Sequence, residues 1–117
     1  MKKIKTLKKN YEFKYVLSKG TYYRGKFITI YIKECLNNNS TNTIGIAVNT
    51  KAGKAVKRNY IKRLIRENYR LIKEDLNKGY KIVFLLNKNV EINKLDFFDI
   101  QKDMINIFNK ANLFVKR

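Results

Sequence analysis

Alternating apolar and polar positions predict β-strands in the first half of the chain. In residues 27–32, three isoleucines at every second position share one face, while Phe27, Thr29 and Tyr31 share the other. Residues 43–48 alternate in the same way. This pattern is typical of strands that bury one face of a sheet against a core.

A further strand is predicted at residues 82–86, which are apolar throughout. A continuous apolar run suits a strand that is covered on both faces, so we expect it in the interior of the sheet. Gly25 interrupts the strand region ahead of residue 27, and the asparagine-rich residues 37–42 are predicted to form a surface turn.

Apolar residues at helical spacing predict a short helix after an extended basic arm at residues 2–9. Asn10 can cap this helix, and Gly20 suits its C-terminal end. Its apolar face consists of Phe13, Val16 and Leu17.

The longest predicted helix covers about residues 55–76 and follows a loop at residues 49–54. Its core face lies within roughly 80° and comprises Ile61, Ile65, Tyr69, Ile72 and Leu76. A final helix can be capped by Asp96. Its core face comprises Phe97, Ile100, Met104, Ile107 and Phe108.

This order of elements predicts an α+β fold, a sandwich in which helices pack on one sheet. The chain has no proline and five scattered glycines, so we expect residues 1–117 to form a single domain. Residues 43–86 form a strand–helix–strand unit. If its strands are parallel, the usual chirality rule predicts a right-handed crossover.

The balance of charge indicates a polyanionic partner. The chain carries 27 Lys and Arg against 9 Asp and Glu, a net charge of +18. Residues 1–33 account for +9 of this charge and residues 51–73 for +8. Because the excess is concentrated in two segments, it is typical of a binding surface rather than of general solubilising charge.

Missing residue types exclude several kinds of site. The chain has no histidine and one cysteine, which excludes histidine-based triads, histidine zinc ligands and internal disulfides. Cys35 is interpreted as a small strand residue. There is no apolar run of about 18 residues and no apolar N-terminal signal stretch, so we expect a cytoplasmic protein with no membrane partner.

The longest helix carries a cationic face beside its apolar face. In angular order this face comprises Lys62, Lys73, Arg66, Asn59, Arg70 and Arg63, and the first turn adds Lys54, Lys57 and Arg58. A solvated face normally mixes signs, but this one offers only Glu67. Cations at a helix N-terminus are unfavourable unless an anion also binds there. We therefore favour a phosphate-binding face over a merely solvated one.

This helix resembles the signature of a known family. Residues 53–67 read GKAVKRNYIKRLIRE, and the bacterial ribonuclease P protein component has the signature G-x-A-V-x-R-N-R-x-K-R-x-x-R. Tyr60 is the one fixed position that differs. Further matching positions extend the resemblance over essentially the whole chain: residues 7–10, Phe13, Val16, Gly20 and Tyr31.

The resemblance implies a helix–three strands–helix–strand–helix fold with a left-handed crossover, against the default. It implies a protein subunit of ribonuclease P, which binds the catalytic RNA and the 5′ leader of precursor tRNA and requires no protein partner. The RNA subunit, using Mg²⁺, would remove the leader. No catalytic or metal-binding residue is therefore expected in the protein, which would be one RNA-binding domain over residues 1–117.

The resemblance also assigns roles to residues. Contacts with RNA would come from Lys54, Lys57, Arg58, Asn59, Lys62, Arg63 and Arg66. Phe13 and Tyr31 would line a cleft for the leader, with Lys51 and Lys54 nearby. The sequence departs from the family pattern at Tyr60, Thr6, Asn87 and Leu17, the last of which stands where the family often has a second cleft aromatic.

From the residues alone, the cleft assignment stays open. The bases of single-stranded RNA can stack on aromatic rings while its phosphates meet Lys and Arg. Phe13, however, shares a helical face with Val16 and Leu17, which favours a core position. Tyr31 fits a core position and a cleft position equally well.

Two other functions compete with this interpretation. A stand-alone metal-dependent nuclease would need convergent carboxylates, whereas Asp96, Asp99 and Asp103 favour the N-terminal half of a helix, where negative charge is stabilising. A basic ribosomal or other structural RNA-binding protein would share the charge and the lack of histidine. The signature block favours the ribonuclease P protein.

Overall fold

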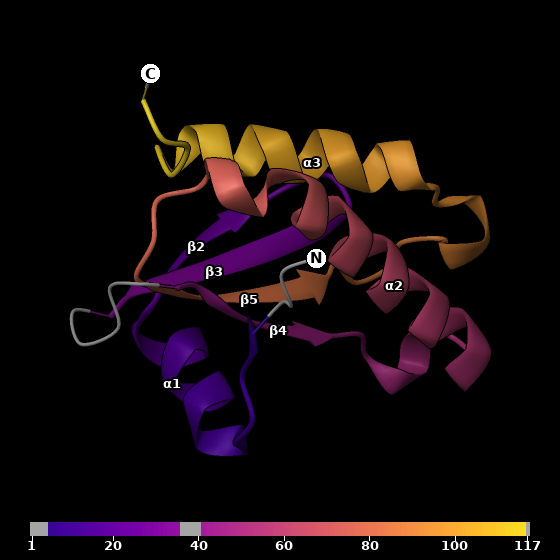
Figure 1. Ribbon diagram of the computed structural model, residues 1–117. Helices are drawn as coiled ribbons and strands as arrows, with labels where there is room; N and C mark the ends of the chain where they lie inside the picture. The colour runs from indigo at the N-terminus through magenta and orange to yellow at the C-terminus, as the bar shows by residue number, and fades with distance from the viewer. Residues whose placement is uncertain (1–4, 36–40, 117) are drawn as a thin grey trace.

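The computed structural model describes residues 5–35 and 41–116, and these form three helices around a mixed sheet (Figure 1). The strands are β1 (Lys5–Thr6), β2 (Thr21–Arg24), β3 (Ile28–Glu34), β4 (Thr43–Ala47) and β5 (Tyr80–Leu86). The helices are α1 (Asn10–Lys19), α2 (Ala55–Ile72) and α3 (Phe97–Lys110), with 3₁₀ turns η1 (Thr50–Ala52), η2 (Lys73–Asp75) and η3 (Ile92–Lys94). The predicted α+β fold class is confirmed.

The strands lie in the order β1-β4-β5-β3-β2. β5 is in the middle, parallel to β4 and antiparallel to β3, which confirms the interior position predicted for the apolar run. β2 and β3 form an antiparallel hairpin. β1 pairs in parallel with β4, so part of the predicted basic arm is a strand. The sequence did not predict β1 because two residues carry no periodicity of their own.

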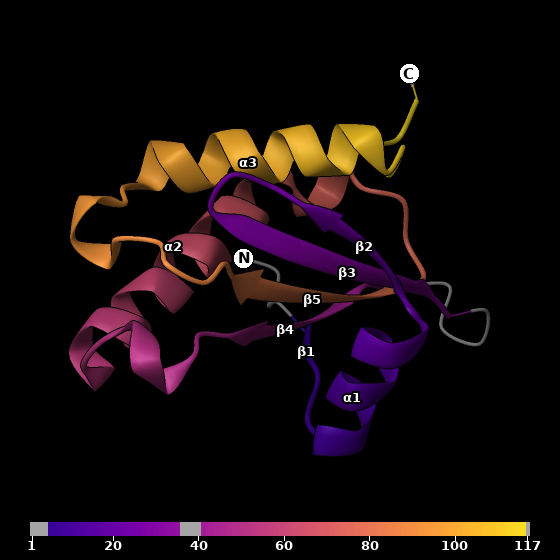
Figure 2. The same ribbon diagram turned by 180° about the vertical axis from the view of Figure 1, so that it is seen from behind.

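The crossover from β4 through α2 to β5 is left-handed (Figures 1 and 2), so the right-handed default is wrong for this chain. Handedness decides which face of the sheet α2 covers. The left-handed path places α2 beside α3, over the face that carries Ile44 and Phe84. A right-handed path would have placed its apolar residues over the opposite face, where Lys33 and Lys81 are paired across β3 and β5.

The hydrophobic core lies between the sheet and the two helices α2 and α3. Phe84 is at its centre, with edge-to-face contacts to Tyr69 of α2 at 5.9 Å and Phe108 of α3 at 6.2 Å. Burial raises the pKa of the Tyr69 hydroxyl to about 12. The predicted core faces of the last two helices are therefore largely confirmed, and Leu64 and Asn68 of α2 are buried as well.

The helix boundaries differ from the predictions at two places. α1 begins after Lys9, and Asn10 is its first residue rather than its cap; the carboxylate of Glu12 instead accepts a hydrogen bond from the Lys8 N–H. α2 ends at Ile72, before Leu76, which is extended and forms an isolated bridge with Phe114. Leu76 thus reaches the core from a connecting segment rather than from the helix.

The remaining loop predictions have mixed outcomes. Asp96 caps α3 in a capping box with Asp99, as predicted. Of the predicted surface turn, residues 37–40 lie outside the described residues, and Asn42 is buried, with its side chain accepting from the Tyr80 N–H and donating to the Asn77 carbonyl. Cys35 follows β3 directly instead of lying within it.

Candidate nucleic-acid interface

The cationic residues of α2 lie on the side of the helix away from the core. Asn59, Arg63 and Arg66 are exposed, and Arg58 and Lys62 are half-buried beside them. The side chains are placed by the helix itself, because Ile61 and Ile65 hold the opposite side against the sheet. The predicted helix residues therefore form one surface, with Lys57 exposed in its first turn.

A turn at Gly53 precedes α2 and marks the N-terminal end of this cationic surface. Gly53 has φ 156° and ψ −172°, a combination that is essentially restricted to glycine. Its carbonyl accepts a hydrogen bond of 3.1 Å from Nε of Arg58, which fixes that side chain against the turn. Lys54, the N-cap residue, makes no side-chain capping bond. The first turn of α2 is consequently surrounded by cations and by the positive end of the helix dipole.

The single acid in α2 does little to neutralise this surface. Nε of Arg63 lies 3.1 Å from Oε1 of Glu67, but both side chains are well exposed. Exposed pairs of this kind contribute about 0–1 kcal/mol. Arg66 and Arg70 are exposed on the same helix, so the face keeps a strong positive potential.

A second candidate surface lies on the opposite side of the sheet, which we call the open face. It is formed by alternate residues of four strands: Tyr22, Arg24, Thr29, Tyr31, Lys33, Thr43, Gly45, Ala47, Lys81, Val83 and Leu85. α1 packs against β3 and β5 on this side. It covers only part of the open face, because Tyr22 and Arg24 of the edge strand remain exposed.

Phe13 of α1 packs directly on Gly45 of β4. A Cβ atom at Gly45 would clash with Cε2 of Phe13, so any other residue at this position would displace the ring. Val16 is fully buried, whereas Phe13 and Leu17 are half-buried. Phe13 therefore lies outside the main core, at the border between α1 and the open face.

Tyr31 lies in the same cross-strand row as Gly45, with Val83 between them. On its other side, Tyr31 is paired with Tyr22 of β2, and the two ring centroids are 5.6 Å apart with an interplanar angle of 34°. Tyr31 is half-buried on the open face and does not belong to the hydrophobic core. Its role as a cleft residue stays a prediction.

A hollow of about 660 Å³ lies where the parallel strands β4 and β5 end. Ala47 and Leu85 of the open face line it, together with Lys51 of η1 and Lys88 of the loop after β5. The Lys51 N–H donates a 2.8 Å hydrogen bond to Oδ1 of Asn49, which holds the loop in place. The structure thus brings Lys51 to the end of the open face.

Two polar side chains fix the hairpin that carries the tyrosines. Asp103 of α3 is buried, and its carboxylate accepts hydrogen bonds from the backbone N–H groups of Lys26, Phe27 and Ile28 at 2.5–2.9 Å. Asn87 donates to the Gly25 carbonyl at 2.9 Å and accepts from the Thr29 hydroxyl at 2.5 Å. The β2–β3 hairpin is therefore tied both to α3 and to the end of β5.

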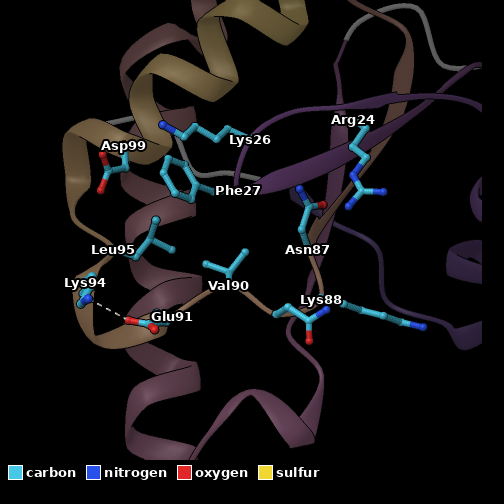
Figure 3. Close-up of a pocket in the computed structure, with 11 residues that line it drawn as sticks. Arg24, Lys26, Phe27, Asn87, Lys88, Val90, Glu91, Lys94, Leu95 and Asp99 are labelled. Carbon is cyan, nitrogen blue, oxygen red and sulfur yellow. Dashed lines mark ion pairs between the residues drawn. The ribbon is translucent and has the colours of Figure 1, made fainter.

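Next to this hairpin is a second hollow of about 540 Å³ (Figure 3). Arg24, Asn87 and Lys88 line one side of it, and the ion pair between Glu91 and Lys94 at 3.2 Å lies on the other. The side of the hollow nearest the open face is thus cationic.

Sequence reasoning found most of these residues but not their arrangement. Phe13, Tyr31 and Lys51 gather on and around the open face, whereas Lys54 begins α2 with the other helix cations. The sequence analysis did not identify Tyr22. Alternation along the strand puts Tyr22 and Arg24 on one face, but the register between β2 and β3 is needed to place Tyr22 opposite Tyr31. The contacts of Gly45 and Asp103 had no signal in the sequence.

The carboxylates of α3 have structural partners, as their positions in the sequence suggested. Asp96 and Asp99 form the capping box and Asp103 binds the hairpin. Within residues 5–35 and 41–116, no group of three or more His, Cys, Asp or Glu is arranged to hold a metal ion. In the same part of the chain, no helix has the length and apolarity needed to span a membrane.

Comparison with known proteins gives consistent matches. The model of the Ribonuclease P family matches residues 1–112. A "Ribonuclease P protein component" of Clostridium botulinum is 38% identical over 109 residues, covering 92% of this chain and 95% of that protein. One of Natranaerobius thermophilus is 36% identical over 116 residues, covering 99% and 97%. The solved RNase P protein of Staphylococcus aureus superposes with a TM-score of 0.83 at 26% identity, covering 97% of this chain and all of that one.

Proposed function

Because the chain belongs to the ribonuclease P protein family, we propose that it binds two RNAs through its two surfaces. The cationic face of α2 binds the RNA subunit of ribonuclease P, and the open face binds the 5′ leader of precursor tRNA. The ribosomal alternative is not favoured, since the family match covers nearly the whole chain.

The observation that carries this proposal is the different chemistry of the two surfaces. The α2 face is a row of cations on a rigid helix, which suits the phosphates of a folded RNA. The open face combines the exposed Tyr22 and the half-buried Tyr31 with Arg24 on the same face and Lys51 at its end, which suits unpaired bases and their backbone.

Contacts confined to the leader would distinguish substrate from product. Mature tRNA lacks the leader, so an interaction on the open face strengthens binding of the precursor without strengthening binding of the product. Phe13 and Tyr31 are the stacking candidates of this proposal, and Lys51 is the phosphate partner at the end of the open face. The protein thereby raises the affinity of the holoenzyme for its substrate.

Cleavage itself is assigned in this proposal to the RNA subunit with Mg²⁺. The protein carries no histidine, and the carboxylates of α3 are engaged in capping and in the Asp103 contacts. We propose that the holoenzyme acts in the cytoplasm and needs no further protein.

Reconstitution with a ribonuclease P RNA tests the proposal. Precursor cleavage at low Mg²⁺ should increase when the chain is added, whereas the chain alone should cleave nothing. Tyr31→Ala should lower affinity for precursors with a long leader by about 1–3 kcal/mol and leave mature tRNA unaffected, and Tyr31→Phe should keep most of the affinity. Cleavage by the purified chain, free of RNA, would contradict the assignment of catalysis.

A further inference from the structure

Tyr22 is an exposed aromatic residue in an edge strand, where a polar residue would normally face solvent. Its side chain is 63% exposed, and its ring lies 5.6 Å from that of Tyr31. The two residues are directly opposite in the β2–β3 register. Two neighbouring rings on one face, the outer one open to solvent, give a platform on which consecutive bases can stack.

We propose that Tyr22 forms an additional base-stacking position, so that the single-stranded leader continues from Tyr31 across the edge strand β2. This inference rests on the proposed function of the open face. The inference adds a direction for the bound RNA strand, and it names a residue that determines the length of leader that the protein recognises.

The other side of Tyr31 already holds the stacking candidate Phe13, whose side chain is half-buried. There the sheet row continues through Val83 to Gly45, which is covered by Phe13. The next inward residues of α1, Val16 and Leu17, are aliphatic and buried or half-buried. A nucleotide that follows the one on Tyr31, on the side away from Phe13, therefore finds the exposed ring of Tyr22.

Cations flank the tyrosine pair on both sides along the strands. Arg24 is two residues from Tyr22 on the same face, and it lines the hollow shown in Figure 3 with Lys88. On the opposite side, Lys33 and Lys81 are directly paired across β3 and β5. Like charges that lie opposite each other are unfavourable in a sheet unless an anion is nearby. A phosphate backbone beside the two rings would supply that anion.

A purely structural role for the pair makes different predictions. A cross-strand aromatic pair makes a small contribution to sheet stability, and Asp103 and Asn87 already hold the hairpin through five hydrogen bonds. If Tyr22 only stabilised the hairpin, its removal would weaken binding of all ligands equally. If Tyr22 binds a base, its removal weakens binding only of precursors whose leader is long enough to reach it.

The test uses the reconstituted holoenzyme and precursor tRNAs with leaders of graded length. The variants are Tyr22→Leu, which keeps an apolar side chain without a ring, and Tyr22→Phe, which keeps the ring. Phe98→Leu is the matched control, because Phe98 is also 63% exposed but lies on α3, over the other face of the sheet. Melting temperatures are measured for all three variants.

For the wild type, affinity should rise with leader length and then reach a plateau. Tyr22→Leu should reach its plateau at a shorter leader and bind long-leader precursor roughly five- to tenfold more weakly. It should bind leaderless tRNA normally, and Tyr22→Phe and Phe98→Leu should behave as the wild type. A 5-iodouracil placed at successive leader positions should cross-link to Tyr31 and to Tyr22 from neighbouring nucleotides.

Two results would overturn the inference. A Tyr22→Leu holoenzyme with the wild-type leader profile would remove Tyr22 from the site while leaving the function of Tyr31 intact. Equal loss for long-leader and leaderless ligands would assign Tyr22 to the fold. If the wild-type holoenzyme itself shows no gain with leader length, the proposed function of the open face fails as well, and the two failures are thus distinguished.

Discussion

The two faces of the sheet are built from the same strands but have opposite characters. On the face under α2 and α3, Ile28, Ile30, Ile44 and Phe84 are fully buried. On the open face, the residues between them include lysines, threonines and the exposed Tyr22. Because strand side chains alternate, each strand serves both faces at once.

This difference separates stability from binding within one sheet. The buried face has two helices and an aromatic cluster around Phe84, and it accounts for most of the apolar area removed from water. The open face has one short helix, which leaves the tyrosines and cations accessible. Substitutions on the two faces should therefore affect different measurements.

The largest effect is expected on the buried face. Phe84→Ala should destabilise the protein by about 3–5 kcal/mol, because it leaves a cavity between α2, α3 and the sheet. Leu85→Ala, one residue along and on the open face, should cost only about 1–2 kcal/mol, since Leu85 is half-buried. Chemical unfolding of both variants measures the contrast, and equal losses would contradict it.

Phe13 lies between the buried core and the open face, so its substitution tests whether it contributes to binding or to stability. Phe13→Ala should lower the affinity of the holoenzyme for long-leader precursor by about 1–3 kcal/mol, and it should cost less stability than Phe84→Ala because Phe13 is half-buried over Gly45. Melting temperature and affinity are measured together, with leaderless tRNA as the control ligand.

Two other outcomes would show that Phe13 has a structural role and does not bind the leader. A variant that unfolds at much lower temperature but keeps the full advantage of long-leader precursor would show that Phe13 only holds α1 on the sheet. Equal weakening of both ligands would lead to the same conclusion.

The smallest effect concerns the cations of α2, which belong to neither face of the sheet. If about five of them each neutralise a phosphate, the logarithm of the affinity for the RNA subunit should fall with the logarithm of salt at a slope of roughly −3 to −5. Arg66→Ala should weaken binding and reduce this slope by about one. Lys102→Ala, an exposed cation on α3, serves as the control. A flat salt response would identify the α2 face as merely solvated.

Much of the fold was predictable because its signals are local. Period-two alternation gave β3 and β4, the apolar run gave the interior strand β5, and helical spacing gave α2 and α3 with the Asp96 cap. The cationic face of α2 was equally predictable, since residues three and four apart on a helix always share a side.

The predictions were wrong where a contact with a residue far away in the sequence determines the local structure. The strand β1 exists because β4 accepts it, and α2 ends at Ile72 while Leu76 pairs with Phe114 near the C-terminus. The handedness of the crossover follows from which face of the sheet is apolar, and local preference does not override that requirement.

The sequence by itself determined the periodicity of the elements, the concentration of charge and the chemistry of each side chain, because these are properties of the chain and its local backbone. The tertiary structure alone decided that Phe13 lies over Gly45, that Tyr22 lies beside Tyr31, and that Asp103 holds the hairpin. Such contacts depend on strand register and helix placement. These are set by the packing of the whole molecule, in which segments far apart in the chain must bury their apolar surfaces together.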